Sequence, residues 1–434
     1  MPLECAGNVT ACRSNAQCRR RAVARGVHHG RRGNGRTPDR RRRVKLNLTL
    51  ARVATVLLAW AGLGLAAAQT AAPPGLPATL AWSAYDVGSG GYNQAVAIGN
   101  AMKQRYGVNL RVLPGKSDVA RTLPVREGQV QFSANGVGGS YLAQEGVFEF
   151  GVKAWGPQPI RGLMLNNSDQ VLTVVAAKDS GVKTVADLKG KRVAWVIGAP
   201  SLNQNITAIL AFANLTWNDV KRVDFGGFGA AMDGVINGQA DAAFTSSISG
   251  KAYQLAKSPR GIVYPVIAHS DKAGWERMNK TAPFFFPFMG AEGAELDKDH
   301  KVESASYPYP ILMAYDRQDA NSVYAMTRAM VETFADYKDA APGNAGWAVE
   351  RQNFAWVIPF HDGAIRYWKE RGLWKPEHQA HNDRLVARQK VLADAWKAVQ
   401  GAAHADDKAF EQAWMKARAD ALTKAGFDAV VTSW

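Results

Sequence analysis

Short apolar runs alternate along this chain with glycine- or proline-containing loops and helical patterns, and this alternation most constrains the fold. Thr79–Tyr85 and Val108–Leu113 are apolar runs of strand length, and Val130–Ser133 is a third, shorter one. Between the first two, Tyr92–Tyr106 carries apolar residues at helical spacing. A repeated strand–loop–helix order predicts an α/β sheet of parallel strands.

The same order starts again after Gln170. Val171–Ala177 is a β-rich run that would leave the first lobe, and it is followed by the strand Val193–Ile197, the helix Asn203–Ala213 and the strand Val220–Phe225. The sequence therefore predicts two α/β lobes joined by extended crossovers. In such an arrangement the ligand binds in the cleft between the lobes.

The predicted segments follow from these patterns and from changes in composition. They are a non-mature basic leader and signal peptide at 1–68, a Pro/Ala linker at 69–78, the first part of lobe 1 at 79–170, lobe 2 at 171–268, a return to lobe 1 with hinge-packing segments at 269–374, and a helical C-terminal extension at 375–434.

The end of the leader has the features of a cleaved secretory signal peptide. Leu48–Ala68 is largely apolar, follows the basic residues Arg43 and Lys45, and ends in three alanines. An uncleaved membrane anchor is the alternative, but the run is short for a span and contains Arg52. We expect cleavage before Gln69 and a periplasmic protein.

The first 43 residues are unusual because they contain twelve arginines and all three cysteines, Cys5, Cys12 and Cys18. A start codon assigned too far upstream, with Val44 as the true first residue, explains such a segment, and a nucleic-acid-binding arm is the alternative. Of the 53 basic and 37 acidic side chains, 14 and 2 lie within residues 1–68, which leaves a net charge of +4 on the remainder. We therefore expect no nucleic-acid partner.

The loop Gly88-Ser89-Gly90-Gly91-Tyr92 lies between the first predicted strand and helix. Such a loop directs backbone N–H groups and a helix N-terminus to one point, which suits a small anion. It is a poor dinucleotide fingerprint, because Asn93 occupies the position of the third glycine. A tight turn that needs positive φ is the alternative.

The next loop, Gly115-Lys116-Ser117, is similar to the end of a P-loop, but Leu110 stands where the leading glycine is required, so nucleotide binding is excluded. Ser117 either caps the following helix or contacts the ligand. Arg121 is a candidate partner for a carboxylate, because a guanidinium can donate two parallel hydrogen bonds to it. A solvated surface position is the alternative for Arg121.

Polar residues also follow the strands of the predicted lobe 2. Ser201 comes after Gly198-Ala199-Pro200 and is a candidate N-cap, and Asn203 follows it closely. Thr245 and Ser246 follow another strand. Because ligands meet the carboxyl ends of the strands in α/β sheets, these residues are candidate ligand contacts, and helix capping alone is the alternative.

Catalytic and metal-binding patterns are weak. The sequence contains no H-E-x-x-H, G-x-S-x-G or paired-cysteine motif. His361 and Asp362 are adjacent, which does not by itself give the geometry of a triad, and the histidines beyond the leader are scattered. We expect no enzyme activity, no metal and no cofactor.

Four stretches resemble the TAXI family, the solute receptors of tripartite ATP-independent periplasmic (TRAP) transporters. The most specific is Ile358–Gly372 (IPFHDGAIRYWKERG), and the others are Gly88–Tyr92, Val185–Val193 and Gly238–Ala242. The resemblance implies a type II periplasmic-binding fold and a small carboxylate ligand, such as a dicarboxylate or an acidic amino acid. It also implies delivery of the ligand to integral membrane permease subunits driven by an ion gradient.

We predict a monomer that closes on one small organic anion. Backbone N–H groups at Gly90–Tyr92 and near Ser201 would hold carboxylate oxygens, and Tyr92, Asn93, Asn135 and Thr245 would set specificity. The predicted ligand-binding residues are Ser89, Gly90, Gly91, Tyr92, Asn93, Ser117, Arg121, Asn135, Ser201, Asn203, Thr245 and Ser246. Three alternatives stay open: a receptor of the same fold for an ATP-coupled transporter, an enzyme on this fold such as a thiamine-precursor synthase, and a permease-docking role for the basic helical tail.

Overall fold

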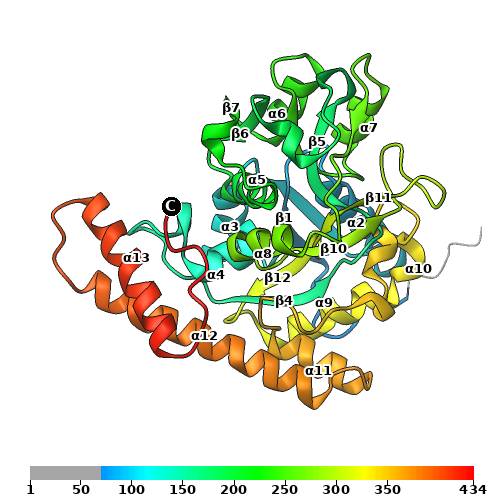
Figure 1. The fold of residues 1–434 in the computed structure, drawn as a ribbon. Helices are drawn as coiled ribbons and strands as arrows, with labels where there is room; N and C mark the ends of the chain where they lie inside the picture. Colours follow the sequence, from blue (N-terminus) through cyan, green and yellow to red (C-terminus); the bar gives the residue numbers. More distant parts are fainter. Residues whose placement is uncertain (1–69) are drawn as a thin grey trace, which may run out of the picture. The chain divides into compact units, whose positions relative to one another are not determined.

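The computed structural model describes residues 70–434 (Figure 1). The predicted signal peptide, its cleavage before Gln69 and the three cysteines lie outside these residues. No helix within the described range is both long and apolar enough to cross a membrane.

The first sheet has five strands in the order β2-β1-β3-β12-β4. These strands are β1 (Thr79–Ala84), β2 (Asn109–Pro114), β3 (Phe132–Asn135), β4 (Ile160–Leu165) and β12 (Ile311–Tyr315). β1 pairs in parallel with β2 and β3, whereas β12 runs antiparallel to both β3 and β4. The expectation of a wholly parallel sheet is therefore wrong at this edge, because a strand from the far end of the chain completes the sheet.

The second sheet repeats this plan in the order β7-β6-β8-β5-β9. Its strands are β5 (Leu172–Ala177), β6 (Arg192–Val196), β7 (Lys221–Phe225), β8 (Ala242–Ser246) and β9 (Ile262–Val263). β6 is parallel to β7 and β8, and β5 is antiparallel to β8 and β9. Each sheet thus receives one antiparallel strand from a crossover, and the predicted two-lobe type II periplasmic-binding fold is confirmed.

The helices of the first lobe come from both ends of the chain. They are α2 (Gly90–Tyr106), α3 (Asp118–Arg126), α4 (Ala143–Glu145), α9 (Ala320–Glu332), α10 (Phe334–Tyr337) and α11 (Asp362–Glu370). Ser89 is the N-cap of α2, and Gly107 ends this helix in the left-handed region at φ 72°. Although proline commonly interrupts helices, α3 continues through Pro124 to Arg126.

The second lobe contains four helices, α5 (Pro200–Phe212), α6 (Phe228–Ile236), α7 (Gly250–Lys257) and α8 (Lys272–Thr281). The N-cap of α5 is Ala199 and Pro200 is its first residue, so Ser201 lies inside the first turn and is not the predicted N-cap. A two-stranded antiparallel sheet of β10 (Phe286–Gly290) and β11 (Val302–Ser306) follows α8.

The remaining helical turns are short. They are η1 (Gly138–Leu142), η2 (Phe148–Phe150), η3 (Lys178–Ser180), η4 (Val185–Leu188), η5 (Trp217–Asp219), η6 (Asn344–Trp347) and η7 (Val349–Arg351).

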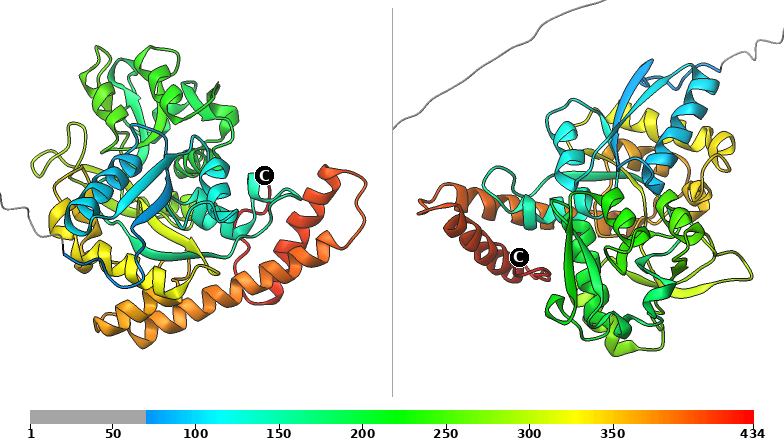
Figure 2. Two further views of the ribbon diagram at one scale, coloured as in Figure 1. Left: turned by 180° about the vertical axis from the view of Figure 1, so that it is seen from behind. Right: turned by 90° about the horizontal axis from the view of Figure 1, so that it is seen from above.

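The predicted C-terminal extension is helical, as expected, and forms a pair of helices, α12 (Pro376–Gln400) and α13 (Asp407–Lys424) (Figure 2). Trp396 and Trp414 pack edge to face between them, with ring centroids 4.8 Å apart. The buried carboxylate of Glu145 pairs with Arg388 of α12 at 2.7 Å and with Arg418 of α13 at 2.5 Å. The extension is therefore fixed to α4 of the first lobe by a buried cluster of ion pairs.

Candidate ligand site

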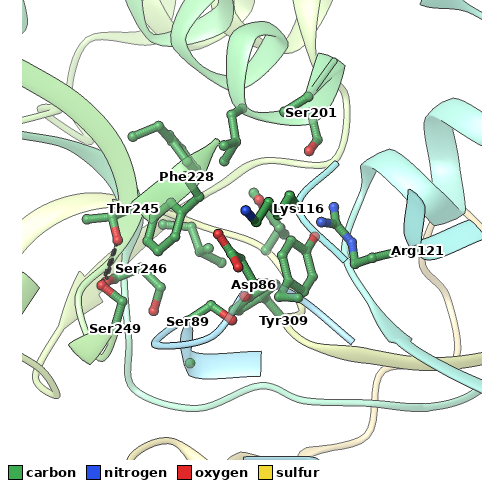
Figure 3. Close-up of a pocket in the computed structure, with 17 residues that line it drawn as sticks. Asp86, Ser89, Lys116, Arg121, Ser201, Phe228, Thr245, Ser246, Ser249 and Tyr309 are labelled. Atoms are coloured by element: carbon green, nitrogen blue, oxygen red, sulfur yellow. Dashed lines mark hydrogen bonds between the residues drawn. The ribbon is translucent and has the colours of Figure 1, made fainter. Parts of the chain in front are cut away.

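A cavity lies where the two lobes meet, next to the carboxyl ends of β1 and β8 (Figure 3). Its walls are made by both lobes and by the crossover before β12. The lining residues are Tyr85, Asp86, Ser89, Gly90, Lys116, Arg121, Leu172, Ala199, Ser201, Leu202, Phe228, Phe244, Thr245, Ser246, Ser249, Tyr307 and Tyr309. The cavity is small, with a volume of about 40 Å³, which is room for roughly three waters. The lobes are thus close together here.

The glycine loop of lobe 1 places its backbone donors as the sequence suggests, but two of them are already bonded. The hydroxyl of Ser89 accepts the N–H of Tyr92 at 3.2 Å, and the phenolic oxygen of Tyr309 accepts the N–H of Gly91 at 3.3 Å. The N–H of Gly90 has no hydrogen-bond partner within residues 70–434. Of the three donors predicted to hold a carboxylate, only Gly90, which lines the cavity, has an uncommitted N–H.

Tyr92 and Asn93 do not line this cavity. Tyr92 instead lies beside Val96, at a separate hollow between α2 and β2. Both residues belong to the first turn of α2, directly after Ser89 and Gly90, which do line the cavity.

Arg121 reaches the cavity, but its guanidinium is held by protein groups. The side chain is 3% exposed, stacks 3.7 Å from the centroid of the Tyr85 ring, and pairs with the carboxylate of Asp118. Its Nε donates to Oδ1 of Asn135 at 3.3 Å, and Nη1 donates to the carbonyl of Gly115 at 3.1 Å. The predicted carboxylate partner therefore already has a carboxylate, supplied by this chain.

The same carboxylate joins the lobes. Oδ2 of Asp118, the first residue of α3 in lobe 1, accepts the backbone N–H of Ser201 in the first turn of α5 at 2.9 Å. The positive N-terminal end of α5, which was expected to bind the ligand, is occupied by this side chain.

Three other predicted residues have structural partners. Ser117 is the N-cap of α3 and accepts the N–H of Ala120 at 3.1 Å. Asn203 bonds both the N–H and the carbonyl of Val196 at 2.9 Å, which ties α5 to β6. Asn135 is the last residue of β3, and its Oδ1 accepts the hydrogen bond from Nε of Arg121. None of the three lines the cavity.

The hydroxyls of lobe 2 differ in their availability. Thr245 and Ser249 hydrogen-bond to each other at 2.8 Å, and Ser246 donates to Gln170. The hydroxyl of Ser201 bonds to no residue of the described chain, although Ser201 is only 2% exposed and its hydroxyl is directed into the cavity (Figure 3). The oxygen itself is open to the cavity and is not among the buried polar atoms that lack a partner, so water or a ligand can bind it there.

The sequence over residues 87–372 matches the model of the NMT1-like family. The chain belongs to this family. Among solved structures, the alkanesulfonate-binding protein SsuA from Xanthomonas axonopodis pv. citri aligns with 14% identity over 73% of this chain and 95% of its own length, at a TM-score of 0.37. A protein from Bordetella bronchiseptica RB50 aligns with 18% identity over 69% and 91%, at a TM-score of 0.40. An ancestral arginine-binding protein bound to arginine aligns with 14% identity over 63% and 99%, at a TM-score of 0.37. No curated protein matches the sequence.

Two charged residues of this NMT1-like site were not predicted from the sequence. Asp86 is the second residue after β1, and an ideal Cβ at Gly229 in the first turn of α6 would lie 3.7 Å from its Oδ2. Lys116 faces the cavity and forms no ion pair with the described residues (Figure 3). The position of Asp86 at the end of a parallel strand could have identified it, by the argument that identified Thr245.

Aromatic rings form much of the remaining wall. Burial raises the pKa of Tyr309 to about 12 and raises the pKa of Tyr85 well above its usual value. Both phenols are therefore neutral at physiological pH, and they act as hydrogen-bonding and packing groups. Phe228 and Phe244 of lobe 2 complete an apolar side of the cavity.

The features considered for catalysis or metal binding lie elsewhere. His361 is the N-cap of α11, and its Nδ1 accepts the N–H of Gly363 at 3.1 Å. Within residues 70–434, no group of three or more His, Cys, Asp or Glu side chains is placed to hold a metal ion.

Proposed function

We propose that this chain is an extracytoplasmic solute receptor that binds a small carboxylate between its lobes and delivers it to a TRAP-type permease driven by an ion gradient. The family and the two-lobe periplasmic-binding fold support the assignment to solute receptors. The carboxylate, the periplasmic location and the permease are the parts that the proposal adds.

The observation that carries the proposal is the unpaired hydroxyl of Ser201 in a nearly closed cavity. It shares this cavity with two further uncommitted donors, the N–H of Gly90 and the ammonium group of Lys116. These donors come from both lobes, so a ligand that accepts hydrogen bonds from all of them stabilises the closed form. A carboxylate suits this set, because it accepts several hydrogen bonds and prefers charged donors.

The permease part of the proposal depends on the resemblance to TAXI receptors. Its most specific stretch, Ile358–Gly372, is built into the first lobe: Phe360 lies beside Gly162 of β4 in a parallel bridge, and α11 packs on α9. This stretch therefore supports the fold of the receptor and does not itself touch the ligand.

The test is calorimetry of the exported protein, after unfolding and refolding to release any retained ligand, against monocarboxylates, dicarboxylates and amino acids. Ser201→Ala should weaken binding of the best ligand about threefold to tenfold, because one neutral hydrogen bond is lost. Lys116→Gln should weaken it at least about tenfold, because a charged hydrogen bond is lost. Lys257→Gln, an equal charge change on the exposed end of α7, is the control.

If the refolded protein binds none of these compounds, the proposed binding of a carboxylate is contradicted. Uptake into vesicles that contain the neighbouring permease then tests the partner. We expect uptake to follow an imposed ion gradient, whereas a strict need for ATP would assign the receptor to an ATP-coupled transporter instead.

A further inference from the structure

Asp118 occupies a position that has the properties of an anion subsite. Its side chain is fully buried, and its two carboxylate oxygens are divided between two strong donors: Oδ1 pairs with the guanidinium of Arg121, and Oδ2 accepts the N–H of Ser201. Arg121 belongs to lobe 1 and Ser201 to lobe 2. One internal carboxylate thus bridges an arginine and the N-terminus of a thirteen-residue helix across the cleft.

The backbone around this group is shaped to hold it. A Cβ at Gly138 would lie 2.2 Å from Cγ of Asp118, and a Cβ at Gly115 would lie 2.6 Å from Cγ of Arg121. Neither contact is possible for a real side chain, so both positions need glycine to leave room for the pair. The carboxylate of Asp118 is therefore cradled, and its place is specified by the surrounding chain.

The subsite adjoins the ligand cavity. Arg121 and Ser201 both line that cavity, and the Ser201 hydroxyl has no partner within the described residues. The backbone N–H of Ser201 is thus taken by Asp118, while its side chain remains available on the side of the cavity. This hydroxyl is an observation independent of the helix end: the residue is 2% exposed, its oxygen opens only into the cavity, and it is available to a ligand group beside the filled subsite.

We propose that Asp118 fills the second anion position of the cleft, so that the ligand carries a single carboxylate and dicarboxylates are rejected. This inference rests on the proposed binding of a carboxylate in the cleft and narrows its class. A dicarboxylate would bring its second charge against the buried carboxylate of Asp118, and like charges repel strongly where water is excluded. Its second carboxylate would also find Arg121 and the end of α5 already neutralised.

The first experiment removes the internal carboxylate and needs no natural ligand. In Asp118→Ala the lost group corresponds to formate, so formate at millimolar concentration should raise the melting temperature of this variant and leave that of the wild type unchanged. Asp319→Ala, which removes an exposed carboxylate that caps α9, is the matched control and should not respond. A folded Asp118→Ala variant without a formate response would overturn the subsite.

The second experiment measures ligand class by calorimetry. We expect the wild type to bind its best monocarboxylate at least tenfold more tightly than the dicarboxylate of the same chain length. Asp118→Asn, which keeps the shape of the side chain and removes its charge, should reduce or reverse this ratio, and it replaces the alanine variant if that variant does not fold. A wild type that binds both classes equally would overturn the inference while leaving carboxylate binding intact. A formate response in Asp118→Ala together with no binding by the wild type would retain the subsite and reject the proposed function.

Discussion

The carbonyl oxygen of Gly88 accepts a hydrogen bond of 3.0 Å from the backbone N–H of Gly250, so the first residue of α7 in lobe 2 rests on the glycine loop of lobe 1. Together with the contact between Asp118 and Ser201, this bond joins helix N-termini of lobe 2 to oxygen acceptors of lobe 1. Both contacts connect one lobe to the other, so we expect separation of the lobes to break them. Closure is therefore stabilised by the protein itself as well as by any ligand.

Gly250→Val should weaken closure without disturbing either lobe. A Cβ at Gly250 would lie 3.2 Å from the Gly88 carbonyl oxygen, and the two methyl groups of valine add to this crowding. If the closed form loses about 1.4 kcal/mol relative to the open form, the affinity for the ligand falls about tenfold. Calorimetry measures the affinity, and small-angle scattering measures the separation of the lobes.

Gly226→Ala is the control for this substitution, because a Cβ at Gly226 has no atom within 4 Å. It should leave both the affinity and the scattering profile unchanged. Equal affinities for Gly250→Val and the wild type would show that contact at Gly88 is not needed for closure.

Tyr309→Phe and Tyr92→Phe should have opposite outcomes. The hydroxyl of Tyr309 accepts the buried N–H of Gly91, so its removal should destabilise the protein by about 1–2 kcal/mol. The hydroxyl of Tyr92 bonds to no residue within 70–434 and lies outside the cavity, so its removal should change neither stability nor affinity. Urea unfolding and calorimetry on both variants decide this. A loss of ligand discrimination in Tyr92→Phe would restore Tyr92 as a specificity residue.

The sequence predicts the strands of the parallel cores well and misses those that complete each lobe. β1, β6 and β7 coincide with the predicted runs to within one or two residues, because apolar residues there lie between glycine-rich or proline-containing loops. β12 was not predicted as a strand of lobe 1. Its partners β3 and β4 lie far away in the sequence, and local patterns do not identify such partners.

Prediction of the site is limited in the same way, because local sequence patterns do not identify contacts between residues far apart in the chain. Ser89 and Gly90 of the predicted glycine loop, the predicted Arg121, and the residues Ser201, Thr245 and Ser246 that follow strands all line the cavity; their role in binding a ligand stays a prediction. The sequence shows Asp118 only as a residue at the start of a predicted helix. Its contact with Ser201 spans 83 positions and depends on closure of the lobes, so neither composition nor spacing reveals that a side chain fills the end of α5.

Glu145→Gln should release the C-terminal extension. Burial alone would raise the pKa of Glu145, but Arg418 and Arg388 outweigh it and hold this pKa below its usual value. Removing the carboxylate leaves two arginines of the buried cluster without their partner, which should cost about 3–5 kcal/mol of unfolding free energy. Urea unfolding and limited proteolysis of residues 375–434 measure the effect. The ligand affinity of the folded variant, measured without urea, should be unchanged.

Asp420→Asn is the control, because its ion pair with Lys416 is exposed and should contribute less than about 1 kcal/mol. If Glu145→Gln were no more destabilising than this control, the extension would be held mainly by its apolar contacts. Deleting 376–434 outright would remove the partners of Glu145 and of the Gly146 carbonyl, which accepts Trp414 Nε1 at 2.6 Å. Point substitutions on the exposed surface of the two helices are therefore the better test of permease docking.

His361 should make the protein less stable as the pH falls below about 6.5. Burial lowers the pKa of His361, and the nearby carboxylate of Asp362 only partly opposes this. The unfolded chain therefore takes up the proton first, and the free energy of unfolding decreases as the pH falls from the unfolded pKa towards the folded one. Protonation of Nδ1 would also remove the acceptor that caps α11 at Gly363. For one titrating group the slope in this window is at most about 1.4 kcal/mol per pH unit.

Urea unfolding of the wild type and His361→Asn between pH 8 and pH 5 measures this slope. Asparagine keeps an N-cap acceptor and does not titrate, so the variant should show a flatter profile with similar stability at pH 8. The paired carboxylate of Glu145 contributes in a different window, because its depressed pKa maintains stability above the unfolded value of 4.5 and the contribution is lost only below it. Parallel slopes for the wild type and His361→Asn above pH 5 would therefore assign the effect to another group.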